Sequence, residues 1–133
     1  MAKRTHDDPK DLCACTSGRP YAACCGPLHA GAPAASAEAL MRSRYAAYAR
    51  HDEAYLLATW HPEFRPSRID FDPAMKWIGL DILRHEQVDE AHAVVEFVAR
   101  FKVGGRAGRM REASRFLRAD GRWVYCDGDQ ATA

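Results

Sequence analysis

The chain has 133 residues, of which 47% are hydrophobic and 28% charged, and its 19 basic side chains nearly balance its 18 acidic ones. This length suits one domain, the hydrophobic content excludes a disordered chain, and the formal charge of +1 selects no class of partner. No apolar run reaches the roughly 20 residues that a membrane-spanning helix needs, and no secretory signal opens the chain. We therefore expect a soluble, cytoplasmic protein without a membrane partner.

Four of the five cysteines lie close together, after a polar arm over residues 1–12; they are Cys13, Cys15, Cys24 and Cys25. In a reducing compartment such a cluster favours metal binding over disulfides. Zinc takes four thiolates in a tetrahedron, and a turn at Ser17-Gly18 allows the two pairs to meet. We predict a closed structural zinc site, with no open position for catalysis. Disulfides, reactive or redox thiols, and another soft-ligand metal are the alternatives.

The sequence predicts a boundary at the short linker 31–35. Residues 1–30 would form the arm and a zinc knuckle, and residues 36–130 one α+β domain. Ser36 suits a helix cap, and the residues after it repeat with helical spacing on one face: Ala37, Leu40, Met41, Arg44 and Tyr48. Asp52 can cap a second helix, which His61-Pro62 would end, and residues 62–73 read as a loop.

The remainder has the alternation of β-strands. We predict strands over 77–86, 91–103, 109–118 and 122–127, with Ile78, Leu80 and Ile82 on one face of the first. Asp120-Gly121 is a strong hairpin signal between the last two strands. Two helices followed by about four antiparallel strands indicate the α+β class. Cys126 is expected to be a small apolar filler in the last strand.

Eight basic side chains lie between residues 100 and 122. They could offer a positive face to RNA phosphates or an acidic protein, but the favoured interpretation is the solvated face of two strands. No row of aromatic residues accompanies them, so base recognition and DNA binding have little support.

Two resemblances rest on particular residues. The segment Cys13-x-Cys15-x-Ser-Gly, five further residues and Cys24-Cys25-Gly-Pro resembles the SEC-C motif, first described at the C-terminal tail of the translocase motor SecA, where the knuckle is a zinc-dependent docking surface. The rest of the chain resembles the YchJ family of small bacterial proteins. The matching stretches are 40–45, 58–62, 95–101, 112–116 and 121–123. That family implies a nuclear transport factor 2-like fold, a curved sheet wrapped round helices.

Arg44 and Glu112 each place a charge among apolar neighbours, which normally requires a partner. The favoured interpretation is a buried ion pair between them. The alternative is a polar floor in the concave pocket that the resembled fold often has, able to hold a small ligand. The candidate pocket residues are Arg44, Tyr48, His61, Glu112 and Ser114, and no residue is assigned a catalytic role.

These observations together predict a zinc-binding adaptor whose knuckle docks a protein or ribonucleoprotein partner. One alternative is an enzyme or small-ligand binder that uses the pocket, which rests on fold analogy. Another is a thiol or metal-handling protein. The resemblance implies a fold but no reaction.

Overall fold

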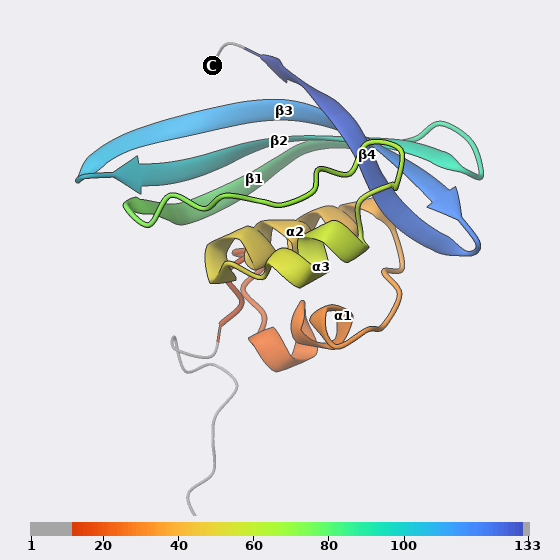
Figure 1. Ribbon diagram of the computed structural model, residues 1–133, viewed down its shortest axis with the longest axis horizontal. Coiled ribbons are helices and arrows are strands. Elements are labelled where there is room, and N and C mark those ends of the chain that lie inside the picture. Colours follow the sequence, from red (N-terminus) through yellow and green to blue (C-terminus); the bar gives the residue numbers. More distant parts are fainter. Residues whose placement is uncertain (1–11, 132–133) are drawn as a thin grey trace, which may run out of the picture.

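The structure, a computed structural model, describes residues 12–131 (Figure 1). Most of the predicted polar arm therefore lies outside the described residues. The elements in chain order are η2 (Tyr21–Ala23), α1 (Gly26–His29), α2 (Ala37–Arg50), α3 (Glu53–Ala58), β1 (Met75–Gln87), β2 (His92–Val103), β3 (Arg106–Ala119) and β4 (Arg122–Ala131). The predicted α+β class is confirmed. Within this part of the chain, no helix is long and apolar enough to cross a membrane.

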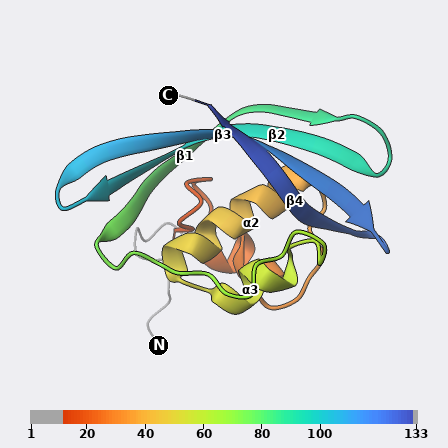
Figure 2. The ribbon, with the colours of Figure 1, turned by 45° about the horizontal axis from the view of Figure 1, so that its top comes forward.

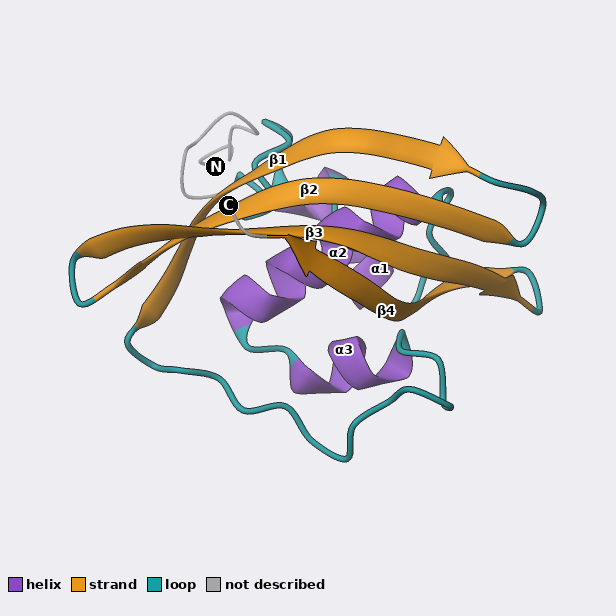
Figure 3. Ribbon diagram, turned by 90° about the horizontal axis from the view of Figure 1, so that it is seen from above, coloured by secondary structure: helices purple, strands orange, loops and turns teal. Residues whose placement is uncertain are grey.

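The four strands form one antiparallel sheet in the order β1-β2-β3-β4. Figures 1 and 3 show that the sheet curves over the helices, with α2 lying against its concave face. The β3–β4 turn is the predicted one: Asp120 and Gly121 have φ angles of 52° and 76°, as a tight hairpin between twisted strands requires. β4 extends beyond the predicted end at residue 127, and this added length proves important for the cavity below.

The helices begin where the caps predicted. The Ser36 hydroxyl accepts a hydrogen bond from the Ala39 amide at 3.1 Å, and the Asp52 carboxylate accepts one from Tyr55 at the same distance. α3 ends at Ala58, before the predicted end at His61-Pro62. The chain leaves the helix there because Thr59 and His61 exchange backbone hydrogen bonds with Tyr125 of β4, at 2.8 Å each.

One predicted strand face is wrong. Ile78, expected to share an inward face with Leu80, is 48% exposed, whereas Leu80 is buried. The register between β1 and β2 shifts between Trp77 and Gly79, and the extra residue of this bulge reverses the alternation. Trp77 and Leu80 therefore both contribute to the concave side.

The predicted basic stretch lies mainly on the outer, convex face of the sheet, where acidic groups of neighbouring strands pair with it. Arg100 meets Asp81 at 2.9 Å and Arg111 meets Glu96 at 2.6 Å. Arg115 meets both Asp127 and Asp129 at 2.7 Å. The acidic partners come from β1, β2 and β4, so three of the eight basic side chains are charge-paired at the solvated surface. This pairing favours the interpretation of the stretch as the solvated face of two strands.

Candidate metal centre and cavity

The N-terminal segment folds back on itself to bring its two cysteine pairs together. The Cys13 amide donates to the Arg19 carbonyl at 2.9 Å, which closes the loop between them. Thr16 and Gly18 have positive φ angles of 62° and 86°, so the chain reverses within a few residues. The predicted turn at Ser17-Gly18 is therefore present.

The four sulfur atoms fit the geometry of a zinc ion. The Sγ atoms of Cys13, Cys15, Cys24 and Cys25 all lie within 4.8 Å of one another. The Cys15–Cys24 separation is 3.5 Å and the Cys24–Cys25 separation is 3.9 Å. A regular tetrahedron with metal–sulfur bonds of about 2.3 Å has edges of about 3.8 Å. The cysteines are free thiols, and a disulfide would require a separation of about 2.05 Å.

The four thiols are linked by hydrogen bonds between their sulfur atoms, and a metal ion could take the place of the shared protons. Hydrogen bonds from Cys13 and then Cys25 hold the pKa of the Cys15 thiol well below its usual range. The pKa of Cys25 is raised, because Cys25 donates hydrogen bonds to Cys13 and Cys15 and because it is buried. The pKa shifts thus favour the thiolate of Cys15 over those of Cys13 and Cys25. A metal ion held by the four sulfurs would bind them as thiolates and release the protons that they carry.

The cysteine knuckle, residues 12–30, is part of the same core as the sheet. Cys13, Cys15 and Cys25 are buried in one cluster with Leu40 of α2 and Leu80 of β1. The Thr16 hydroxyl also donates to the Leu80 carbonyl at 3.1 Å. Arg42 donates to the Cys15 carbonyl at 3.2 Å. The knuckle therefore packs on the domain instead of projecting from it, as Figure 2 also shows.

A chain of polar side chains adds a second link between the knuckle and the helices. Tyr21 and His29 are joined through the His29 Nδ1 at 2.7 Å, and the His29 Nε2 lies 2.8 Å from the Ser43 carbonyl. A carbonyl only accepts, so Nε2 donates and Nδ1 accepts from Tyr21. The Ser43 and Tyr55 hydroxyls lie 2.6 Å apart. The network fixes α1 between η2 and α2.

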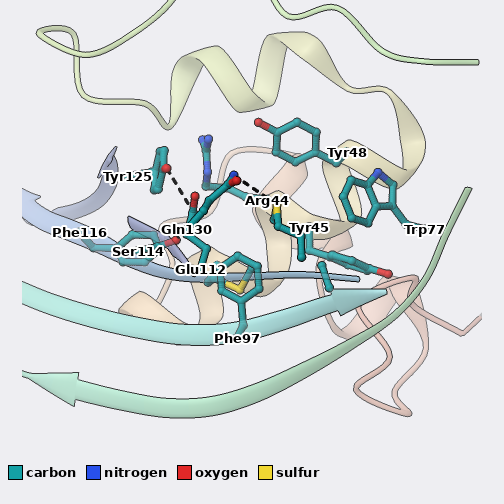
Figure 4. A pocket seen from close by; sticks show the side chains of 13 residues that line it. Arg44, Tyr45, Tyr48, Trp77, Phe97, Glu112, Ser114, Phe116, Tyr125 and Gln130 are labelled. Carbon is teal, nitrogen blue, oxygen red and sulfur yellow. Dashed lines mark hydrogen bonds between the residues drawn. The ribbon is translucent and has the colours of Figure 1, made fainter. Parts of the chain in front are cut away.

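A cavity of about 220 Å³ lies between α2 and the concave face of the sheet (Figure 4). Most of its lining is aromatic or sulfur-containing, and the polar contribution comes from a few side chains. The lining residues are Met41, Arg44, Tyr45, Tyr48, Trp77, Phe97, Ala99, Met110, Glu112, Ser114, Phe116, Tyr125 and Gln130. Four of the five candidate pocket residues are thus brought together.

Arg44 is buried at 5% exposure but forms no ion pair with a carboxylate among residues 12–131. Its Nη1 donates to the Leu56 carbonyl at 2.8 Å and to the Thr59 hydroxyl at 2.7 Å. The guanidinium carbon lies 4.9 Å from the Trp60 ring centre and 4.6 Å from that of Tyr125. Burial lowers the pKa of Arg44. The predicted Arg44–Glu112 ion pair is therefore wrong, because aromatic rings and carbonyl oxygens surround the cation instead.

Glu112 is held at the floor of the cavity by other groups. Its Oε1 accepts from the Ser114 hydroxyl at 2.5 Å and from the Tyr125 hydroxyl at 3.4 Å. Register places Phe97, Glu112 and Gln130 in one row across β2, β3 and β4. Gly128 makes room for the carboxylate, since a Cβ there would lie 2.6 Å from the Glu112 Cδ.

Comparison with known proteins places this fold and cysteine cluster in a family. Residues 36–128 match the model described as YchJ, middle NTF2-like domain. The chain belongs to the YchJ family. It is 54% identical to a UPF0225 protein of Ralstonia nicotianae, over 91% of this chain and 92% of that one. A UPF0225 protein of Bordetella bronchiseptica is 48% identical, over 95% and 98% of the two chains.

Two solved structures are similar to this YchJ-family chain, and both are described as SEC-C motif containing proteins. The solution structure from Rhodopseudomonas palustris has a TM-score of 0.80 and 40% identity, over 90% of this chain and 98% of that one. The crystal structure from Psychrobacter arcticus has a TM-score of 0.73 and 27% identity, over 96% and 81%. Both resemblances found in the sequence, to the YchJ family and to SEC-C motif proteins, are confirmed.

His61 does not line the cavity. It follows Trp60 in the loop after α3, where its amide donates to the Tyr125 carbonyl at 2.8 Å and its Nδ1 accepts from the Glu63 amide at 3.0 Å. Its ring lies against Phe64. The expectation that His61 belongs to the pocket is wrong, because strand-like pairing with β4 directs this segment along the sheet edge.

Sequence reasoning missed several residues that line the cavity, among them Trp77, Tyr125 and Gln130. The alternation of β3 contained the signal for its own row, Met110, Glu112, Ser114 and Phe116. The alternation of β1 did not predict the inward position of Trp77, because a bulge follows this residue. Gln130 lies beyond the predicted end of β4. Cys126 is half-buried and outside the cysteine cluster, with a pKa raised by burial.

Proposed function

We propose that this YchJ-family chain is a zinc-stabilised adaptor, in which the cysteine knuckle docks a protein partner. The observation that carries the proposal is the closed set of four sulfurs, all within 4.8 Å, of which three belong to buried cysteines. Four protein thiolates fill a tetrahedral zinc site, so the metal keeps no position for substrate or water. Bound zinc would act as a crosslink there.

Cys13, Cys15, Cys24 and Cys25 would hold the ion. Segments of about 20 residues bury too little surface to fold alone, and structural zinc supplies the missing free energy in such cases. Here the crosslink would fix the loop 13–19 and η2 on the outside of the core. The four thiolates and one Zn²⁺ would carry a net charge near −2, which is costly to bury and which the nearby cation of Arg42, bonded to the Cys15 carbonyl, would partly offset.

The outer side of the knuckle supports docking. Ala14, Gly18, Arg19 and Ala22 are exposed, although the cysteines beside them are mostly buried. Arg19 donates to the Ala23 carbonyl and so stiffens this surface. A rigid, small-residue surface held by metal needs little ordering when a partner binds. The resemblance to the translocase motif, whose knuckle docks proteins, supports the same use.

A surface variant tests docking without touching the zinc ligands. Ala22→Glu places a charge on the exposed knuckle, and Ala107→Glu places the same change on the exposed β2–β3 end of the sheet. We expect a protein cross-linked to the wild type to be recovered equally with Ala107→Glu and about tenfold less with Ala22→Glu. Zinc content should be equal in all three proteins.

The outcomes separate the possible partners. A protein that is lost with Ala22→Glu and retained after ribonuclease treatment supports direct docking. Loss after ribonuclease treatment assigns the surface to a ribonucleoprotein. If every cross-linked protein survives the Ala22→Glu change, the knuckle is not a docking surface and only its structural role remains.

A further inference from the structure

The cavity holds a buried cation whose hydrogen-bonding capacity is only partly used. A guanidinium has five N–H groups, and the two bonds of Arg44 both come from Nη1. The hydrogen bonds within residues 12–131 use neither its Nε nor its Nη2, and the Tyr48 hydroxyl also interacts with the guanidinium. Burying an arginine without an anion is costly, and a planar guanidinium suits a carboxylate. An anionic group in the cavity would therefore find a prepared partner.

A carboxylate stands in the same cavity without neutralising that cation. Glu112 uses Oε1 to accept from Ser114 and Tyr125, and no hydrogen bond in the described part of the chain reaches its Oε2. The glutamate can therefore accept from a donor that enters the cavity. An ammonium group is the donor that also compensates its charge.

Tyr125 keeps the two charges apart. Its ring packs 4.6 Å from the guanidinium carbon of Arg44, while its hydroxyl donates to Glu112 at 3.4 Å. Burial is the main cause that raises the pKa of Tyr125, so its hydroxyl remains a neutral donor. A ligand beside Tyr125 would thus meet a cation at one end and a carboxylate at the other.

The opposite wall is apolar. Figure 4 shows Trp77 and Tyr48 across the cavity from Tyr125 and Ser114, and Phe97 on the sheet below. The volume of about 220 Å³ equals about seven waters at ~30 Å³ each. It is below the ~300–1,000 Å³ of sites for drug-sized molecules, so the occupant would have on the order of ten non-hydrogen atoms.

From these features we infer that the cavity binds a small zwitterion of the α-amino-acid type with an apolar side chain. Its carboxylate faces Arg44, its ammonium faces Glu112, and its side chain lies against Trp77 and Phe97. Such a ligand leaves the charge of the cavity unchanged, whereas a simple acid or amine adds one uncompensated charge. The inference is independent of the docking proposal, because none of these residues belongs to the knuckle.

NMR titration of the full-length, zinc-loaded protein with three sets of probes tests this inference. The first set is L-phenylalanine, L-methionine and L-leucine. The others are 3-phenylpropionate, which lacks the ammonium, and phenethylamine, which lacks the carboxylate. We expect amide shifts at the cavity strands with at least one amino acid. The corresponding acid and amine should bind about tenfold more weakly than phenylalanine, since each loses one charge-assisted contact.

Glu112→Gln distinguishes recognition from a structural effect. It preserves the size of the side chain and an oxygen for Ser114 and Tyr125, and it removes the negative charge. Phenylalanine binding should weaken about tenfold, while 3-phenylpropionate binding should stay equal or improve, so the preference for the amino acid disappears. Glu86→Gln, an exposed change on β1, is the matched control and should leave both affinities unchanged.

Two results with the wild-type protein would overturn the inference. One is the absence of shifts at the cavity with all three amino acids at millimolar concentration. The other is a wild-type protein that binds 3-phenylpropionate or phenethylamine as tightly as phenylalanine. Equal weakening of every probe by Glu112→Gln would likewise reject direct recognition of the ammonium.

Discussion

In the knuckle the chemically active side chains come from one short segment, Cys13 to Cys25, whereas the cavity draws on α2 and all four strands. The cysteines meet one another directly, with sulfurs within 4.8 Å. Arg44 and Glu112 share a cavity but remain separated by Tyr125. The first cluster is complete within the chain and needs only a cation. In the second, two opposite charges have hydrogen-bond partners but no ion-pair partner among residues 12–131, which supports the proposed ligand site.

Breaking the knuckle should have the largest effect. Cys15→Ser removes a ligand from a fully buried position in the shared core. We expect loss of zinc and a fall in the free energy of unfolding of more than about 4 kcal/mol, because structural zinc contributes ~10–16 kcal/mol in isolated fingers. Urea denaturation and metal content measure both quantities.

The matched control is Cys126→Ser, which changes a half-buried cysteine outside the cluster. It should keep its zinc and lose no more than about 1 kcal/mol. Equal stability and equal zinc in Cys15→Ser and the wild type would show that Cys15 is not a metal ligand and would contradict the four-cysteine site.

Arg44→Met should have the next largest effect. Methionine fills a similar volume but loses both hydrogen bonds from Nη1 and the contacts with the rings of Trp60 and Tyr125. The Leu56 carbonyl and the Thr59 hydroxyl each lose a donor. We expect destabilisation of about 2–4 kcal/mol in chemical denaturation. A free energy of unfolding equal to that of the wild type would mean that the buried Arg44 cation does not stabilise the fold.

Two tyrosine substitutions compare a bonded hydroxyl with an unbonded one. The Tyr55 hydroxyl lies 2.6 Å from Ser43, and Tyr55→Phe should cost about 1 kcal/mol. The Tyr45 hydroxyl is buried without a partner among the described residues, and burial raises its pKa to about 12. Tyr45→Phe should therefore be neutral or slightly stabilising. Thermal denaturation of the pair checks the order, and the reverse order would contradict these contacts.

Arg115→Ala should have the smallest effect. Arg115 pairs with Asp127 and Asp129 on the outer face of the sheet, where all three side chains are about half or more exposed. Exposed pairs contribute about 0–1 kcal/mol and weaken with salt. The difference from wild type should shrink between 0.05 and ~0.5 M salt. If Arg115→Ala lowered the free energy of unfolding as much as Arg44→Met, the exposed and the buried arginine would stabilise the fold equally, which would contradict this account.

The knuckle residues lie close together in the sequence, whereas the cavity residues come from distant segments. This difference also explains what the sequence could predict. The cysteine cluster could be predicted from the sequence because Cys13 and Cys15 are separated from Cys24 and Cys25 by only one turn. The helix caps at Ser36 and Asp52 were equally local. The apolar face of α2 correctly placed Arg44 and Tyr48 toward the interior, and the alternation of β3 grouped Glu112 with Ser114.

The remainder depended on contacts between distant segments. A bulge in β1 turned the Ile78 side chain to the outer face of the sheet. The residue pattern within a strand does not predict where such a bulge occurs. Pairing of Thr59 and His61 with Tyr125 ended α3 early and took His61 away from the cavity. The failure of the Arg44–Glu112 pair has the same origin. Two charges that need partners were placed correctly on their elements, but Tyr125, from a third element, stands between them.

The metal content of the purified full-length chain tests the central claim most directly. Native mass spectrometry should show one zinc ion per chain, which is lost on denaturation together with the packing of the knuckle. Supplementing the growth medium with zinc should not raise the content beyond one. A chain that carries no metal, or whose mass changes only by oxidation of the thiols, would contradict the closed zinc site and assign the cysteines to thiol chemistry.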